Sequence, residues 1–246
     1  NPTAVTRVFS AKGRPNDHPV IVHILDPSWV ERVAIIDDRV PLLAEHYWPG
    51  PLTIVLKRLD CIPSEISGGL STVALRVPNH PVALSLIRAC DRPLAAPSAN
   101  SFGKLSPTRA EDVDPEIEKT AAMILQGGPC TVGIESTVLD LSTSVPRILR
   151  PGGIPRAELE TLLGQSLESA EPGAPKSPGS HPVHYAPRTP LRLADQLRPE
   201  DAGLLFDEPQ NERQIQMPNQ AERYATVLYA TLKQLDQLAF PEMVVQ

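Results

Sequence analysis

The residues best suited to do chemistry lie in five short polar islands, each at the edge of a strand or helix that the sequence predicts. In chain order the islands are "KGRPNDHP" (12–19), "IVHI" (21–24), "STVALRVP" (71–78), "LAAPSANSFGKLSPT" (94–108), and "GIESTV" with "RILRPGG" (133–153). They supply arginines, lysines, histidines, hydroxyls and small residues. They do not supply a pair of carboxylates suited to general acid–base catalysis. Guanidinium forks with hydroxyl and amide donors suit phosphate and carboxylate groups. The islands therefore indicate a site for anions rather than one for hydrolysis.

Simple spacing brings several candidate side chains together. Lys12, Arg14 and His18 are grouped around a turn. Thr72 and Arg76 share one face of a strand, because alternate side chains of a strand point the same way. Small residues beside these groups let a ligand approach the backbone closely. The other candidates in the islands are His23, Ser98, Asn100, Ser106, Ser136 and Arg150.

Each island also has an ordinary structural interpretation. Lys12 and Arg14 fit a pair of charges that offsets a helix dipole at its C-terminus. His23 fits a core histidine, and Arg76 fits a charge that protects an edge strand from pairing. The polar run 98–108 fits an Asx or ST turn that leads into a helix cap. Taken singly each island is weak evidence, and only their combination calls for a common cause.

The hydrophobic pattern predicts an α/β domain over residues 1–164. Helices are predicted over 3–11, 26–34, 39–47, 80–90 and 155–164, and strands over 20–25, 52–57, 71–77, 93–99, 123–125, 136–141 and 147–150. Strands recur more often than strict β-α-β alternation allows, which favours a mixed sheet. The expected fold class is α/β, a twisted mixed open sheet with flanking helices.

A second, smaller unit is predicted after a linker. Residues 165–190 are rich in Pro, Ser and Gly, as linkers are. Residues 191–246 contain predicted strands at 203–206 and 243–246 and an amphipathic helix at 221–239, which indicate a small α/β, Rossmann-like domain. The apolar stripe of that helix consists of Tyr224, Leu228, Leu232, Leu235 and Leu238. So short a unit buries little apolar surface of its own, so we expect its stability to depend on contacts with the first domain.

Charge and composition narrow the class of protein. The net charge is −6, yet residues 1–156 balance 16 Lys and Arg against 16 Asp and Glu, so the excess lies beyond residue 156. A protein that mainly grips nucleic acid normally carries a basic excess. Cys61, Cys90 and Cys130 lack any C-x-x-C spacing, which predicts neither zinc nor a disulfide framework and favours the cytoplasm. No apolar run is long enough to span a membrane, and no metal-ligand set is predicted.

Taken together, the islands resemble the threonylcarbamoyl-AMP synthase family, that is, the YrdC-like domain in its longer form with a C-terminal extension. The matching motifs, in order, are "AKGRPNDHPVIVHI", "WPGPLTIVL", "GGLSTVALRVPNHP", "PLAAPSANSFGKLSPT", "GIESTVLDL" and "ILRPGGI". They cover most of residues 1–156, while "PGSHPVHYAP" and "RYATVLYATLKQLD" resemble the long form. Family members carry a further T-V-Y-G-like segment before the "NPTAV" helix that helps to bind threonine, so we expect such a segment to be missing here.

The resemblance implies a reaction and a set of roles. L-threonine, bicarbonate and ATP give threonylcarbamoyl-adenylate and pyrophosphate, which feeds N6-threonylcarbamoylation of adenosine 37 in tRNA by a downstream transferase. The residues implied as catalytic are Lys12, Arg14, Ser98 and Asn100. The residues implied to contact ATP are Arg14, His18, Thr72, Ser98, Ser106, Arg150 and Tyr185. The residues implied to contact threonine are His23, Arg76, Ala96 and Ser136. ATP is thus expected as a substrate, with Mg²⁺ held by phosphates and water.

Three other functions compete with this one. A YrdC-like module without synthase activity would bind double-stranded or structured RNA through the same basic surface. A carbamoyl-transfer enzyme would use carbamoyl phosphate, although the acylphosphatase and zinc-finger segments of such chains are not visible. A structural relic would bind no ligand and would leave the islands unexplained.

Overall fold

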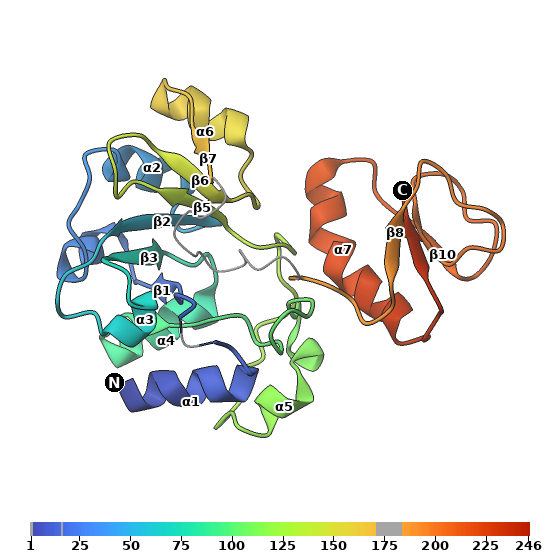
Figure 1. Ribbon diagram of the computed structural model, residues 1–246, viewed down its shortest axis with the longest axis horizontal. Helices are drawn as coiled ribbons and strands as arrows, with labels where there is room; N and C mark the ends of the chain where they lie inside the picture. Colours follow the sequence, from blue (N-terminus) through green and yellow to red (C-terminus); the bar gives the residue numbers. More distant parts are fainter. Residues whose placement is uncertain (1, 16, 171–183) are drawn as a thin grey trace.

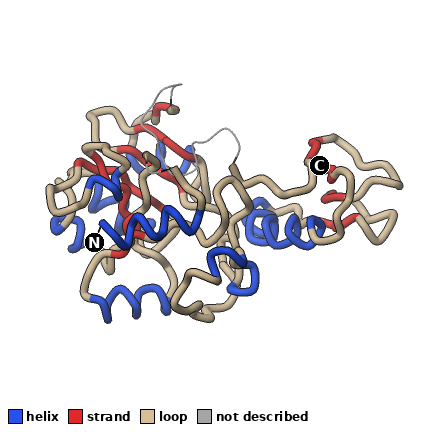
Figure 2. The backbone as a smooth tube through the Cα atoms, turned by 60° about the horizontal axis from the view of Figure 1, so that its bottom comes forward, coloured by secondary structure: helices blue, strands red, loops and turns tan. Residues whose placement is uncertain are grey.

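The computed structural model describes residues 2–15, 17–170 and 184–246, which fold into two bodies joined by a narrower region (Figure 1). The first body contains a sheet whose strands lie one above another in the view of Figure 1, with helices around it. The second body contains a smaller sheet and one long helix, α7 (Ala221–Asp236), which faces the first body. The tube in Figure 2 shows the same separation from another direction.

The large sheet is mixed, as the sequence predicted. Its strands, all within the described residues, are β1 (Val22–His23), β2 (Leu52–Lys57), β3 (Thr72–Arg76), β4 (Leu94–Ala95), β5 (Thr137–Asp140), β6 (Arg147–Arg150) and β7 (Glu168–Ser169). Their order across the sheet is β4-β1-β3-β2-β5-β6-β7. The pairs β1–β3, β2–β5 and β6–β7 are parallel, whereas β1–β4, β2–β3 and β5–β6 are antiparallel. This arrangement confirms the predicted fold class.

The two faces of this sheet have different tasks, and strand alternation separates them. On β3, Val73 and Leu75 join the main hydrophobic core, whereas Ala74 belongs to a small separate cluster on the other face. The helices around the sheet are α1 (Pro2–Lys12), η1 (Pro27–Arg32), α2 (Val40–Tyr47), α3 (Ser64–Ser67), α4 (Pro81–Cys90), η2 (Ala110–Asp112), α5 (Pro115–Glu118) and α6 (Arg156–Leu163). Phe9 of α1, Leu43 of α2 and Leu159 of α6 are buried in the main core. The second face is therefore left to line a site.

The second body is a parallel sheet in the order β10-β9-β11-β8, packed against α7. Its strands are β8 (Leu191–Leu193), β9 (Gly203–Leu205), β10 (Gln214–Gln216) and β11 (Met243–Val245). The sequence predicted β9, α7 and β11. It missed β8 and β10 because neither is a continuous apolar run like β9 and β11: β8 reads Leu-Arg-Leu and is exposed throughout, and β10 reads Gln-Ile-Gln.

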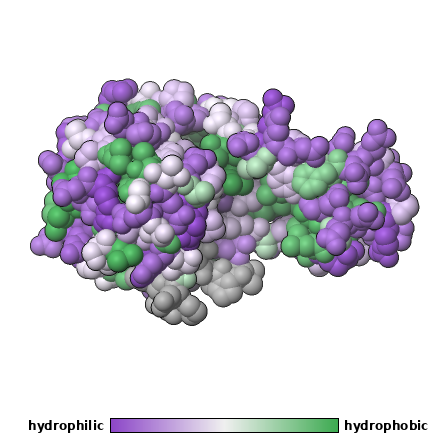
Figure 3. Space-filling model, turned by 90° about the horizontal axis from the view of Figure 1, so that it is seen from above, coloured by the Kyte–Doolittle hydropathy of each residue, from purple (hydrophilic) through white to green (hydrophobic). Residues whose placement is uncertain are grey.

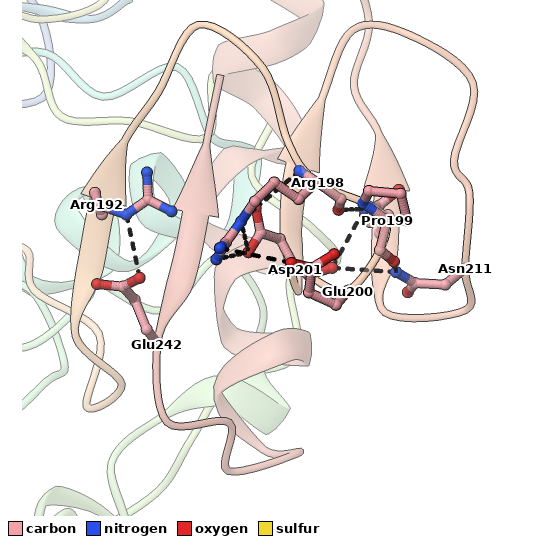
Figure 4. A network of polar contacts seen from close by, with 8 residues as sticks. Arg192, Arg198, Pro199, Glu200, Asp201, Asn211 and Glu242 are labelled. Atoms are coloured by element: carbon pink, nitrogen blue, oxygen red, sulfur yellow. Dashed lines mark hydrogen bonds and ion pairs between the residues drawn. The ribbon is translucent and has the colours of Figure 1, made fainter.

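Polar contacts fasten the far end of this small sheet (Figure 4). The guanidinium of Arg198 donates to Asp201 Oδ1 at 2.8 Å, and Asn211 Nδ2 donates to the carbonyl of Asp201 at 3.2 Å. Arg192 on β8 donates to Glu242, just before β11, at 3.1 Å. Because the arginine side chains of these ion pairs are largely exposed, the contacts orient the loops rather than add much stability.

The two bodies share a hydrophobic cluster, which explains how so small a second domain is stable. Leu105 and Ile134 of the first body pack with Tyr229, Leu232 and other residues of the second. Hydrophobic surface also shows in the space-filling view near the place where the bodies meet (Figure 3). The cluster supports the expectation that the C-terminal unit depends on the first domain.

Some predicted elements differ from the structure. Residues 123–125 do not form a strand, and Met123 is 72% exposed, because a three-residue apolar run is too short to identify a strand. Residues 27–32 form a 3₁₀ helix rather than an α-helix. The strand predicted over 93–99 is confined to β4, because Pro97, two residues after β4, has no backbone N–H to donate. Leu238 lies beyond the end of α7 and is exposed. In the predicted linker, 168–169 pair with the first sheet as β7, while 171–183 lie outside the described residues.

We predict that Gly133→Ala loosens the junction between the bodies. Gly133 has φ +81°, and a Cβ there would lie 2.4 Å from the carbonyl oxygens of Ala225 and Thr226 on α7. Gly164 is the matched control, since it has φ +63° and no atom within 4 Å of its added Cβ. Gly164→Ala should lower the free energy of unfolding by about 1–2 kcal/mol from backbone strain alone. Gly133→Ala should cost about 1–3 kcal/mol more, because helix and loop must move apart. Urea denaturation of both variants measures the difference, and equal losses would contradict the close packing.

Candidate functional site

The predicted anion-binding residues converge on a cavity of about 310 Å³ on the second face of the large sheet. Ligand sites of small molecules commonly have a volume of several hundred Å³. The cavity is lined by Arg14, Val20, Ile21, His23, Arg76, Ala96, Pro97, Ser98, Glu135, Ser136, Arg150, His184 and Tyr185. Its walls thus come from the end of α1, the ends of β1, β3 and β6, and the loops that follow β4 and precede β5.

His23 and Arg76 are brought together by strand pairing. They are direct partners in the parallel register of β1 and β3, so both reach the cavity from adjacent strand ends. The Nε of Arg76 donates to the carbonyl of Gly50 at 2.9 Å, which fixes the guanidinium. The buried Nδ1 of His23 has no hydrogen-bond partner among the residues that the structure describes. A buried polar atom without a partner is costly, and it commonly marks a place where a ligand or water binds.

Arg14 enters the cavity from the turn after α1. Gly13, at φ +59°, ends the helix, and Arg14 then donates its Nη2 to the carbonyl of Pro19 at 2.7 Å. Its buried Nε has no hydrogen-bond partner within the described ranges 2–15, 17–170 and 184–246. The side chain is thereby anchored at one nitrogen while another remains available to an anion.

Arg150 and Ser136 form the third side of the cavity. The Nη2 of Arg150 donates to the carbonyl and hydroxyl oxygens of Ser136, at 2.7 and 2.9 Å. Its Nη1 donates to the hydroxyl of Tyr185 at 3.1 Å. Ser136 is itself fixed by a 2.7 Å hydrogen bond between its hydroxyl and that of Thr53 on β2. Tyr185 has φ +57°, so the backbone of a non-glycine residue is held in an unfavourable conformation beside the arginine.

The cavity is electropositive and partly removed from water. Burial, and then the charge of Arg150, lower the pKa of Arg76 to about 10. Burial is also the first cause of the lowered pKa of Arg14, to which Arg150 adds repulsion. Burial lowers the pKa of His23 to about 3, so the imidazole is neutral at physiological pH. An anion placed among the three arginines would relieve this repulsion.

Lys12 and Asn100 brace the loop after β4 rather than line the cavity. The Nζ of Lys12 donates to the backbone carbonyls of Ser98 and Asn100. The amide of Asn100 donates to the carbonyls of Ser101 and Lys104, at 3.0 and 2.8 Å. These contacts hold Ser98, which is exposed at the cavity wall, in place. Two of the four residues implied as catalytic thus occupy positions that shape the loop.

Three further sequence candidates also lie away from the cavity lining. Thr72 shares a face with Arg76 but lies at the other end of β3, about 13 Å along the strand at the usual rise per residue. His18 is buried with its ring edge-on to Phe102, at 5.6 Å between centroids. Ser106 directs its hydroxyl to Glu135 Oε1 at 2.6 Å. The remaining implied site residues do lie together in the cavity lining, namely Arg14, His23, Arg76, Ala96, Ser98, Ser136, Arg150 and Tyr185.

Sequence reasoning missed Glu135, although it stands in the quoted "GIESTV" motif. Glu135 is an acidic residue in motifs that otherwise supply cations and hydroxyls, and this contrast could have identified it as a site residue. It also missed Gly50, whose carbonyl holds Arg76, because backbone acceptors leave no trace in side-chain patterns.

A larger cavity of about 850 Å³ lies beside the first and shares Pro97 and Ser98 with it. It lies between α1 and the region of α5, and small apolar side chains such as Ala4, Val8 and Ala121 contribute much of its wall. It lacks the cluster of arginines, so the smaller cavity is the better candidate for anion chemistry.

The described residues contain no group of three or more His, Cys, Asp or Glu side chains that could hold a metal ion. The donor set of the cavity is cationic apart from Glu135, whose oxygens accept hydrogen bonds from hydroxyls. These residues do not fit a Mg²⁺ site built from protein ligands. Among the same residues, no helix has both the length and the apolar character required to cross a membrane.

Comparison with known proteins gives consistent matches along the whole chain. Residues 1–152 match the model of the Sua5, YciO and YrdC family, described as "Telomere recombination", and residues 154–246 match "Threonylcarbamoyl-AMP synthase, C-terminal domain". The threonylcarbamoyl-AMP synthase of Bacillus subtilis is 42% identical over 201 residues, which covers 79% of this chain and 58% of the relative. That of Pyrococcus abyssi is 44% identical over 190 residues, which covers 75% of this chain and 56% of the relative. The chain thus spans less than two thirds of the length of these relatives.

The fold also matches a solved structure. A crystal structure of P. abyssi Sua5 complexed with L-threonine superposes with a TM-score of 0.89 and 34% identity, covering 99% of this chain and 78% of the other.

We predict that the stability of the protein rises with pH between about 8 and 10.5 because of Lys12. Burial, and then the charge of Arg14, lower the pKa of Lys12 from 10.5 to about 8. In this window the unfolded chain binds a proton that the folded chain has lost, so raising the pH favours the folded state. The free energy of unfolding should rise by up to about 3 kcal/mol relative to the Lys12→Met variant, which lacks this group. Denaturation curves at pH 7.5 and 10 test this, and parallel pH profiles of the two proteins would contradict it.

Proposed function

Because this chain belongs to the Sua5, YciO and YrdC family, we propose that it forms threonylcarbamoyl-adenylate and pyrophosphate from L-threonine, bicarbonate and ATP. Both matched regions and the names of the curated relatives support this proposal. The nucleotide enters as an anion and the amino acid carries a carboxylate, so both require hydrogen-bond donors, and the reaction requires no protein nucleophile.

One observation carries the proposal, namely the convergence of Arg14, Arg76 and Arg150 on a single cavity. Two of the buried nitrogen atoms there, Arg14 Nε and His23 Nδ1, have no hydrogen-bond partner in the part of the chain that the structure describes. Such atoms are satisfied when a ligand supplies oxygen or nitrogen partners. In a domain that binds no ligand, burying these charged and unpaired groups together would lower stability without any compensating contact.

The chemistry follows in two steps. The amine of threonine attacks the carbon of bicarbonate, water leaves, and a carbamate forms. A carbamate oxygen then attacks the α-phosphorus of ATP, and the bond to the β-phosphate oxygen breaks, which releases pyrophosphate. No covalent enzyme intermediate is needed, so catalysis rests on positioning and on neutralising the phosphate charge.

The geometry supports separate places for the two substrates. Arg76 beside neutral His23 suits the carboxylate and the amine or hydroxyl of threonine, close to Ala96 and Ser136. The solved Sua5 that holds L-threonine supports threonine as a substrate. Arg14, Ser98 and Arg150 suit the phosphates, with Tyr185 closing over them. Mg²⁺ that enters with ATP would be held by phosphates and water, and no protein step depends on it.

We place the product in the path to N6-threonylcarbamoyladenosine of tRNA, in the cytoplasm, with a transferase that consumes the adenylate. Direct RNA binding is the alternative function. The equal numbers of basic and acidic residues over 1–156 argue against that alternative, because proteins that mainly bind nucleic acid normally carry a basic excess.

The first experiment follows pyrophosphate release by this chain. Release should require ATP, L-threonine and bicarbonate together, because the attacking group is a carbamate built from two of them. Release that is indifferent to threonine would refute the synthase proposal. An RNA-binding module would instead release none, and its affinity for tRNA would fall steeply as salt is raised.

We also predict that Arg14→Ala lowers turnover by at least about 100-fold with little effect on stability. Loss of one guanidinium that stabilises transferring phosphate commonly costs two or more orders of magnitude. Ser98→Ala should lower turnover by a smaller factor of about 10, because a hydroxyl donor is removed. The control is Arg88→Ala on α4, an exposed arginine away from the cavity. Turnover and melting temperature are measured for each variant, and parallel losses of both would favour a structural role.

A further inference from the structure

The C-terminal domain reaches the wall of the cavity through one side chain of α7. The hydroxyl of Tyr229 donates to Glu135 Oε2 at 2.7 Å. The hydroxyl of Ser106 donates to the other oxygen, Oε1, at 2.6 Å. Both oxygens of the carboxylate that lines the cavity are therefore engaged by neutral hydroxyl donors, one from each body.

The Tyr229 hydroxyl is well suited to remain a donor. The residue is 8% exposed, and burial followed by the negative charge of Glu135 raises the pKa of its hydroxyl above the ordinary value. The phenol is thus protonated at any physiological pH. It stays bonded to the carboxylate as long as α7 remains docked.

Glu135 lies next to the arginine cluster. Its neighbour Ser136 accepts three hydrogen bonds from Arg150, so the carboxylate is one residue away from that contact. Bonds between an arginine and a carboxylate are stronger than bonds between a hydroxyl and a carboxylate. Without its hydroxyl partners, Glu135 would be drawn toward the arginines and would compete with an anionic substrate.

We propose that Tyr229 is a positioning residue which, with Ser106, holds Glu135 away from the arginines and so keeps them available to substrate. The inference rests on the proposed function of the cavity and adds a role for the C-terminal domain in it. The domain acts by keeping an acidic side chain occupied rather than by touching the reacting atoms.

Two neighbouring contacts support this role for α7. The ring of Tyr229 stacks on Tyr185 with centroids 6.1 Å apart and planes 23° apart, and Tyr185 in turn accepts a hydrogen bond from Arg150. Gly133, two residues before Glu135, lies so close to α7 that it has no room for a Cβ. The helix is thus fixed closely enough for a single hydroxyl to set the direction of the carboxylate.

The test is Tyr229→Phe, which keeps the ring and its stacking but removes the hydroxyl. The dissociation constant of ATP, measured by calorimetry, and the KM for ATP should both rise about tenfold, with kcat changed much less, because the released carboxylate competes for the arginines. Tyr224→Phe on the same helix is the matched control; its ring packs against Phe206, outside the cavity, and its KM should not change.

A second substitution separates charge competition from structural damage. Adding Glu135→Gln to Tyr229→Phe removes the competing charge, so the double variant should bind ATP as tightly as Glu135→Gln alone. A double variant as weak as Tyr229→Phe would overturn the proposal, as would an unchanged ATP affinity in Tyr229→Phe. Failure of the proposed function would appear differently, since the wild-type chain itself would then release no pyrophosphate in response to threonine.

Discussion

The site depends on how its positive charges are held, which is by backbone carbonyl oxygens. Arg76 donates to Gly50, Arg14 to Pro19, Arg150 to Ser136, and Lys12 to Ser98 and Asn100. A carbonyl orients a cation without cancelling its charge, whereas a carboxylate partner would do both. The cluster therefore keeps its positive charge, at a cost in stability that burial and mutual repulsion impose.

This constraint explains why the turns around the cavity are as important as its side chains. The carbonyl of Gly50 lies just before β2, that of Pro19 just before β1, and those of Ser98 and Asn100 in the loop after β4. Each is placed by the end of a strand in one sheet, so the strand order sets the geometry of the cations. Thr53 extends the same logic on β2, where its hydroxyl fixes Ser136 and hence the acceptor of Arg150.

The sequence predicts the parts of this design that repeat locally. Alternation along a strand places Arg76 on the face opposite the main core, and the end of α1 places Arg14 at a turn. Alternation does not say how far along the strand a site extends, which is why Thr72 shares the face but not the cavity. A short strand is detected only when it is an apolar run, which is why β8, exposed at all three positions, was missed. Glu135 and Tyr229 are 94 residues apart in the chain, and no local pattern can announce a hydrogen bond between them.

The longest-range feature joins the two bodies through aromatic rings. His18, Phe102, His184, Tyr185 and Tyr229 contact one another in sequence, with centroids between 4.0 and 6.1 Å apart. The row begins beside α1 and ends on α7, and its fourth ring carries the hydroxyl that Arg150 contacts. Displacing any ring shifts its neighbours, because stacked and edge-to-face contacts have preferred geometries. The docking of the small domain is therefore coupled through these rings to the position of Arg150.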